Sequence, residues 1–67
     1  MSKLKEIREA KGLSQSQLIN KSGVNLSTLQ HYEQGYRDIN KAQAITLYKL
    51  AQALGVNIED LLEKHEN

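Results

Sequence analysis

Apolar residues recur along this chain at the three- and four-residue spacing that is typical of amphipathic helices. Residues 2–11 form a first stretch of this kind, and Gly12 follows it as a residue that favours helix ends. A longer apolar stripe runs through residues 40–54, and a short one follows Asn57. The residues expected to face the core in these stretches, and in the loop before residue 40, are Leu4, Ile7, Ala10, Ile39, Ile45, Leu47 or Tyr48, Leu50, Ala51, Leu54, Ile58, Leu61 and Leu62.

Residues 15–35 predict two short helices joined by a tight turn. Ser14 and Gln17 form the S-x-x-Q pattern of a capping box at the start of the first helix. Gly23 suits the end of that helix because it can take a positive φ angle, and Asn25 suits the start of the next because its side chain can accept a backbone N–H. Two helices joined so closely must cross steeply. Their inner faces are expected to meet through Leu18, Val24, Leu29 and Tyr32.

The second helix of this pair has one apolar side and one side that is polar but uncharged. On a helical wheel of about 100° per residue, Leu29 and Tyr32 lie opposite a group of hydroxyl, amide and imidazole side chains. An ordinary surface helix would carry Lys and Glu pairs there. Glutamine presents a donor and an acceptor side by side, which matches the major-groove edge of adenine. The pattern therefore indicates a helix that reads DNA. The polar group consists of Ser27, Gln30, His31 and Gln34.

The order of residues in this region resembles a known family. The pattern L-S-Q-x-x-L-x-x-x-S-G-V-x-x-S-T-L-x-x-Y-E-x-G, from Leu13 to Gly35, is followed by L-x-K-L-A-Q-A-L-G-V from Leu47 to Val56. Together these patterns are similar to the phage Cro and repressor (XRE-like) type of helix-turn-helix domain. The similarity extends over residues 4–62. It implies an all-α, compact, lambda-repressor-like domain of five helices that binds operator DNA through its third helix.

The resemblance also implies roles for three polar residues. Gln15 matches a glutamine that contacts the DNA backbone, although a solvated residue at a helix start is the open alternative. Arg8 and Glu33 match a pair that joins the first helix to the end of the third. We interpret this pair as structural, because a partly buried carboxylate is costly unless it is paired.

The wheel and the resemblance together give the expected DNA contacts, in two groups. The residues expected to read base edges are Ser27, Gln30, His31 and Gln34, with Leu26 touching a thymine methyl group. The residues expected to hold phosphates are Gln15, Asn25, Thr28, Arg37 and Lys41.

Two features depart from the family pattern. The stretch after Gly35 is longer and lacks proline, and it most simply extends the fourth helix to an Asn40 cap with Gln43 at the capping-box position. Lys41 would then lie at a helix N-terminus, where the helix dipole disfavours a cation unless a phosphate docks there. An ordinary surface lysine is equally compatible with the sequence. Ile19 replaces the usual alanine near the helix crossing, which leaves open a wider crossing angle or a contact with a neighbouring element.

Composition limits the possible functions. The 67 residues form one small domain, residues 1–67, for which a single core supplies roughly 3–5 kcal/mol and leaves little room for a buried catalytic cavity. The absence of cysteine excludes disulfides and thiolate metal sites. No stretch reads as a membrane span or as the apolar core of a signal peptide, so the expected location is cytoplasmic.

Charge is unevenly distributed, although the net charge is only +1. The chain up to Lys41 carries seven Lys and Arg against four Asp and Glu, whereas the rest carries two against four. The basic part coincides with the predicted helix pair, which favours a phosphate backbone as its partner.

Two other classes of function fit the sequence less well. An enzyme would need polar groups gathered in a pocket, but His31 and His65 are far apart in sequence and belong to no metal-binding spacing. We therefore expect no catalytic residue, metal or cofactor, and no membrane or small-molecule partner. An antitoxin-like or adaptor module that binds a protein is the alternative, with Tyr36, Arg37 and Leu26 as its anchors. The prediction is a sequence-specific regulator, a repressor more than an activator, that binds double-stranded operator DNA and pairs as a homodimer on it.

Overall fold

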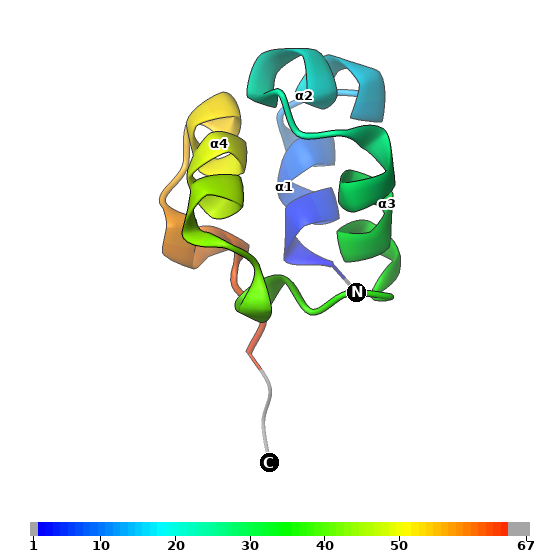
Figure 1. The fold of residues 1–67 in the computed structure, drawn as a ribbon. Coiled ribbons are helices and arrows are strands. Elements are labelled where there is room, and N and C mark those ends of the chain that lie inside the picture. The colour runs from blue at the N-terminus through cyan, green and yellow to red at the C-terminus, as the bar shows by residue number, and fades with distance from the viewer. Residues whose placement is uncertain (1, 65–67) are drawn as a thin grey trace.

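The computed structural model describes residues 2–64 as a set of helices packed around one core (Figure 1). Its α-helices are α1 (Lys3–Ala10), α2 (Gln15–Ser22), α3 (Leu26–Gln34) and α4 (Ala44–Leu54). Two 3₁₀ helices, η1 (Ile39–Lys41) and η2 (Ile58–Leu61), precede and follow α4. In Figure 1, α3 and α4 stand on opposite sides of α1, and α2 lies across the top. The described residues contain no strand, which confirms the all-α class.

The predicted count of five α-helices is wrong, because the last of them is only a 3₁₀ turn. η2 begins after Asn57, whose backbone N–H donates to the Asp60 carboxylate at 2.9 Å. Glu59 and Asp60 do begin a helical turn, as acidic residues favour. Leu62 then takes an extended backbone conformation, so the turn ends before a full α-helix can form.

The start of α4 also differs from the prediction. The helix does not begin after an Asn40 cap but at Ala44, and its N-cap residue Gln43 makes no side-chain capping hydrogen bond. The preceding residues form η1, where the Asp38 carboxylate accepts the Asn40 backbone N–H at 3.0 Å. Lys41 therefore lies in η1, and the helix-dipole argument for its binding an anion at the start of α4 is wrong.

The boundaries of α2 and α3 confirm the capping signals. Ser14 Oγ accepts the Gln17 N–H at 3.1 Å, and Gln17 Oε1 accepts the Ser14 N–H at 2.8 Å. Gly23 ends α2 at φ 77°, a left-handed conformation that glycine adopts without a Cβ clash. Asn25 Oδ1 then accepts the Thr28 N–H at 2.8 Å and begins α3. These features depend on residues close in sequence, which is why the sequence predicts them.

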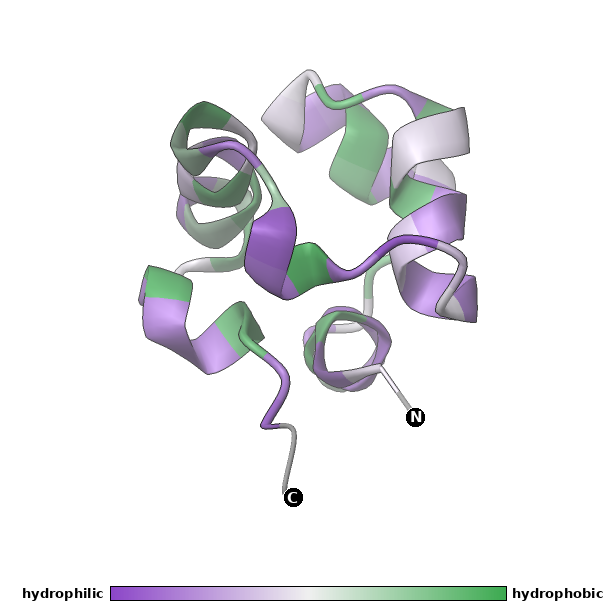
Figure 2. Ribbon diagram, turned by 60° about the horizontal axis from the view of Figure 1, so that its bottom comes forward, coloured by the Kyte–Doolittle hydropathy of each residue, from purple (hydrophilic) through white to green (hydrophobic). Residues whose placement is uncertain are grey.

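Each of the four α-helices and η2 contributes one fully buried leucine to the core. These residues are Leu4, Leu18, Leu29, Leu50 and Leu61. Figure 2 shows hydrophobic segments on every element that faces the centre, with hydrophilic segments mostly turned outward.

Several predicted core positions can now be compared with the structure. Ile39 is buried in the loop as expected, and of the two alternatives on α4 it is Leu47 that is buried while Tyr48 is exposed. Ile45 and Ile58 were expected to face inward and do not, with 54% and 36% of their surface exposed. A helical wheel at about 100° per residue places Ile45 opposite the buried residues of α4, so its inclusion in the apolar stripe was wrong. Ile58 is the first residue of the 3₁₀ turn η2, not part of an α-helix. Ile19 is half-buried and packs against the core.

The segment after η2 is held in place by Asn40. Its Nδ2 donates to the Glu63 carbonyl at 2.6 Å, and its Oδ1 accepts the Glu63 N–H at 2.8 Å. The Glu63 carboxylate accepts the Lys3 N–H at 2.6 Å, at the start of α1. Three distant parts of the chain are thereby joined at one end of the molecule.

Within residues 2–64, none of the helices has the length and apolar character needed to cross a lipid bilayer. His65 lies outside the described residues.

Candidate nucleic-acid interface

The connection between α2 and α3 fixes the orientation of α3. Val24 lies in this connection and is buried, between the fully buried Leu18 of α2 and Leu29 of α3. Because both helix ends are capped and the connection is short, α3 has little freedom to turn about its axis. One side of α3 therefore faces the core and the other is presented outward.

The outward side of α3 is polar and uncharged, as the helical wheel predicted. Leu29 and Tyr32 are buried on the inner side. Figure 1 shows α3 at the edge of the molecule, with no other element covering its outer side. Among the predicted base-reading residues, Leu26, Ser27 and Gln34 are exposed, whereas Gln30 and His31 are half-buried.

Arg8 of α1 and Glu33 of α3 form an ion pair. Arg8 Nε donates to one carboxylate oxygen of Glu33 at 2.7 Å and Nη2 donates to the other at 3.0 Å, while Nη1 donates to the Leu13 carbonyl at 2.8 Å. Only 9% and 2% of the two side chains are exposed. The hydrogen bond that the Arg8 guanidinium donates to Glu33 raises the pKa of Arg8, against the opposing effect of burial. The raised pKa keeps the guanidinium charged at neutral pH, and its contribution to stability is lost as pH rises into strong alkali.

Gln15 extends this ion pair toward the outward side of α3. Its Nε2 donates to Glu33 Oε1 at 3.1 Å, and its Oε1 accepts from Gln30 Nε2 at 3.4 Å. The sequence does not predict this chain of contacts, because the chain joins residues of α2 and α3 that no spacing connects. A primary amide carries two N–H donors, so Gln15 and Gln30 each keep one for another partner. Phosphate binding by Gln15 stays a prediction.

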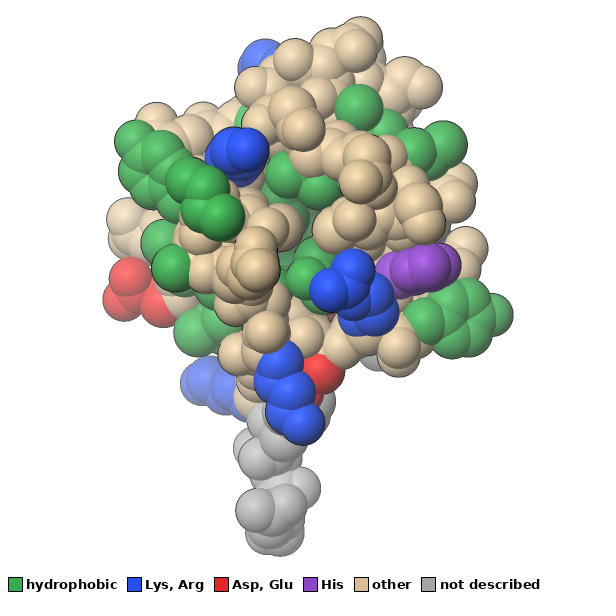
Figure 3. All heavy atoms as spheres, viewed as in Figure 1, with side chains coloured by type: hydrophobic (Ala, Val, Ile, Leu, Met, Phe, Trp, Pro, Cys, Tyr) green, Lys and Arg blue, Asp and Glu red, His purple; other side chains and the backbone are tan. Residues whose placement is uncertain are grey.

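The loop after α3 lies directly beside the same surface. The backbone N–H groups of Tyr36 and Arg37 both donate to the His31 carbonyl, at 2.9 and 3.2 Å. The Tyr36 ring meets the His31 ring edge-on, with 6.1 Å between centroids, and the Arg37 guanidinium lies 5.2 Å from the centre of the Tyr32 ring. Figure 3 shows the imidazole in purple with basic and hydrophobic side chains next to it.

Tyr36 is exposed, at 76%. Its contact with His31 was not predicted, because the loop geometry depends on how Gly35 ends α3. The contact places an aromatic side chain at the edge of the surface expected to read DNA.

The predicted phosphate-binding residues on α3 and beyond it lie toward both ends of the helix. Asn25 and Thr28 belong to its beginning, where the Asn25 side chain uses Oδ1 for the cap and keeps its amide N–H groups. Arg37 follows the end of α3 and Lys41 lies in η1, and both are exposed.

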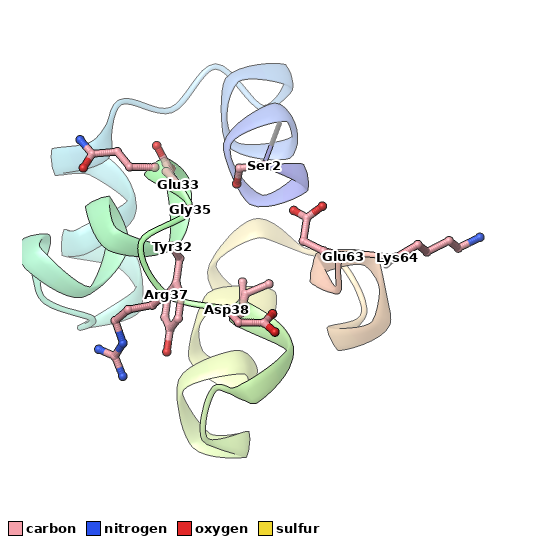
Figure 4. A pocket seen from close by; sticks show the side chains of 10 residues that line it. Ser2, Tyr32, Glu33, Gly35, Arg37, Asp38, Glu63 and Lys64 are labelled. Atoms are coloured by element: carbon pink, nitrogen blue, oxygen red, sulfur yellow. The ribbon is translucent and has the colours of Figure 1, made fainter. Parts of the chain in front are cut away.

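An open hollow of about 590 Å³ lies beside the end of α3 (Figure 4). Its carboxylates are engaged within the fold, since Glu33 accepts from α1, Glu63 from the start of α1, and Asp38 from η1. Arg37 and Lys64 point away from the hollow in opposite directions (Figure 4). Within residues 2–64, no group of three or more His, Asp or Glu is placed to hold a metal ion.

These features define a class of protein. A short helix pair, whose second helix presents hydrogen-bonding side chains outward and has an exposed arginine just past its end, is the arrangement of helix-turn-helix DNA-binding proteins.

Comparison with known proteins specifies the family. Residues 4–61 match the family described as Helix-turn-helix. The chain is 41% identical over 56 residues to the uncharacterized HTH-type transcriptional regulator y4dJ of Sinorhizobium fredii (strain NBRC 101917 / NGR234), which covers 84% of this chain and 69% of the relative. It is also similar to the crystal structure of the restriction-modification controller protein C.AhdI from Aeromonas hydrophila, with a TM-score of 0.77, 37% identity, and 90% and 86% of the two chains covered. The chain belongs to the helix-turn-helix family and is a DNA-binding transcriptional regulator.

Proposed function

We propose that this regulator is a repressor that recognises one operator sequence by placing α3 in the major groove. The observation that carries the proposal is the outward side of α3, which offers donors and acceptors without charge and is held by buried residues behind it. Direct readout requires hydrogen-bonding groups at fixed positions. Occupying an operator can block transcription without any catalytic step. A protein with this role acts on DNA in the cytoplasm.

In this proposal, the base contacts come from five residues of α3. The exposed amide of Gln34 and the hydroxyl of Ser27 can reach deepest into the groove, because the core does not restrict them. Gln30 and His31 contribute from the sides, where the contacts with Gln15 and Tyr36 restrict their orientation. The exposed Leu26 side chain suits contact with a thymine methyl group.

The phosphate contacts come from the residues that surround this face. These are Gln15, Asn25, Thr28, Arg37 and Lys41. Contacts of this type fix the register of a protein on DNA but carry no sequence information. Only two of the five are cations, so one copy of the chain should bind weakly.

Weak binding by one copy favours a pair of copies on a two-fold symmetric site. Helix-turn-helix dimers bind half-sites that are about 34 Å apart, one turn of the DNA helix. We therefore propose that the operator is an inverted repeat and that the chain acts as a homodimer, at least when it is bound to DNA.

Selection of bound sequences from a random duplex library tests the proposal. We expect an enriched inverted repeat, and an affinity for it that falls linearly with salt on logarithmic axes. If no sequence is enriched and binding is absent even at low salt, the polar side of α3 serves a protein partner instead. If the chain binds an enriched site but activates a reporter promoter from it, the proposed DNA contacts stand and the repressor role is wrong.

A further inference from the structure

The loop between α3 and α4 carries the two cations among the proposed phosphate-binding residues. Arg37 precedes η1 and Lys41 is the last residue of η1, and both side chains are exposed. Neither forms an ion pair with another residue of the described range 2–64, so both charges are available to a partner. A cation on a mobile loop must be ordered when it binds, and that ordering reduces affinity. The contacts that hold this loop in the free chain therefore affect how well the cations bind phosphates.

The first half of the loop is held by α3. The backbone N–H groups of Tyr36 and Arg37 donate to the His31 carbonyl at 2.9 and 3.2 Å. The Arg37 guanidinium also lies 5.2 Å from the centre of the buried Tyr32 ring. Arg37 is thus positioned by the helix that it follows.

The second half of the loop is held by a distant segment. η1 is only three residues long, and a helix this short is not stable by its own hydrogen bonds. The Asn40 side chain attaches it to the residue that lies 23 positions further on, since Oδ1 accepts the Glu63 N–H at 2.8 Å and Nδ2 donates to the Glu63 carbonyl at 2.6 Å. In Figure 1 the segment after η2, in orange to red, passes beside η1 at the bottom of the molecule. Two bonds from one amide to one residue fix orientation as well as distance.

Glu63 is anchored on its other side by α1. Leu62 takes an extended conformation, φ −76° and ψ 141°, which leads the chain out of η2. The Glu63 carboxylate then accepts the Lys3 N–H at 2.6 Å. Glu63 therefore uses its backbone for η1 and its side chain for α1, and the two functions can be separated by substitution.

We propose that Asn40 is a positioning residue for DNA binding, which holds η1 through Glu63 so that the neighbouring Lys41 meets a phosphate. This inference rests on the proposed function, because it requires the phosphate contact of Lys41. The amide oxygen of Asn40 and one of its N–H groups are already engaged within the chain, so its role is to support the loop. Without these bonds, Lys41 must be ordered at the moment of binding. The segment after η2 is thereby part of the DNA-binding unit, although it lies outside the helix pair.

Fluorescence anisotropy with a mixed-sequence duplex at low salt tests the inference, because phosphate contacts act on all sequences alike. Asn40→Ala should weaken binding about three- to tenfold, the effect of losing one or two hydrogen bonds. Lys41→Ala should weaken the binding of the original chain but add little to Asn40→Ala, since the lysine is no longer positioned. A residue that acts independently of Lys41 would give losses that add. Circular dichroism sets the working temperature, at which all variants keep the helix content of the original chain.

A pair of substitutions at residue 63 separates the support of η1 from a direct DNA contact by Asn40. Glu63→Ala and Glu63→Pro both remove the carboxylate, but only proline removes the backbone N–H that Asn40 accepts. Leu62 already has the extended conformation that is favoured before proline. Glu63→Pro should therefore bind more weakly than Glu63→Ala, and should add little to Asn40→Ala.

Three results would overturn the inference. Asn40→Ala binds as tightly as the original chain, the losses from Asn40→Ala and Lys41→Ala add, or Glu63→Pro and Glu63→Ala bind equally well. In each case, weaker binding by Lys41→Ala leaves the proposed function standing. If the original chain binds no duplex even at low salt, the proposed function fails and the inference fails with it.

Discussion

Among single residues, Arg8 has the most demanding environment. Its guanidinium is nearly buried and satisfied by Glu33 on two sides and by the Leu13 carbonyl on the third. Removing one partner of such a pair leaves a buried charge without compensation, which costs about 3–5 kcal/mol. This cost is comparable to the whole stability expected of a domain this small.

Glu33→Ala should therefore leave the chain largely unfolded at room temperature, as measured by circular dichroism during heating. Glu9→Ala, at an exposed position on α1, should change stability by less than about 0.5 kcal/mol. Replacing both partners, Arg8→Met with Glu33→Leu, should recover much of the loss because no buried charge remains. Similar melting of the Glu33 and Glu9 variants would contradict the structural role of the pair.

The contacts of Gln15 and Gln30 connect this ion pair to a side chain that we propose to read a DNA base. Gln30→Ala should cost about 1–3 kcal/mol of operator binding and relax the preference at one base pair. Gln15→Ala should lower affinity on all sequences by removing the proposed phosphate contact, and should also relax the preference at the same base pair, because it frees the Gln30 side chain without removing it. Gln34→Ala is the comparison, since that exposed residue should affect a different base pair. Binding measured against single-base operator variants distinguishes these outcomes. Equal weakening on every sequence would reassign Gln30 to the backbone.

At the scale of the elements, the helices differ in how well their ends are capped. α1, α2 and α3 each have an N-cap side chain that accepts a backbone N–H, from Ser2, Ser14 and Asn25. α4 begins at Ala44, and its N-cap residue Gln43 makes no such bond. An uncapped first turn leaves backbone donors to water, so this end is where the domain can be stabilised most simply.

Gln43→Ser should stabilise the domain by about 0.5–1 kcal/mol, because a serine hydroxyl at the N-cap can accept an N–H of the first turn. For a domain of this size, 1 kcal/mol corresponds to roughly 4–8 °C in melting temperature. Ser14→Ala should have the opposite effect by removing an existing capping box. If Gln43→Ser lowers the melting temperature, the glutamine has a contribution beyond the cap.

At the scale of the whole molecule, the position of each charged side chain matters more than the net charge. Arg37 follows α3, whereas Lys64 points the opposite way (Figure 4). A net charge of +1 therefore does not describe the surface that meets DNA. The affinity of that surface for DNA should depend on salt through the few cations that reach phosphates.

Arg37→Ala should reduce the slope of log affinity against log salt by about one, and lower affinity on all sequences alike. Lys64→Ala, which removes the same charge on the other side, should leave the slope unchanged. The slopes are obtained from fluorescence anisotropy at several salt concentrations. Equal slopes for Arg37→Ala and the original chain would place Arg37 outside the DNA contact.

The sequence by itself determined the features that depend on neighbouring residues. Caps at Ser14 and Asn25, the ends of helices at Gly23 and Gly35, and the polar outward side of α3 were all predicted, since each rests on spacing within one or two turns. The resemblance further supplied the Arg8–Glu33 pair and the family.

Only the tertiary structure decided what depends on packing between distant segments. Hydrogen bonds between the Asn40 side chain in η1 and the Glu63 backbone after η2 join these two segments, and no local pattern specifies that contact. The Gln15 contacts follow from the positions of whole helices. An apolar stripe predicts that its residues pack against another apolar surface. Packing decides which residues of the stripe meet the core: of the two alternatives on α4, Leu47 is buried and Tyr48 is exposed.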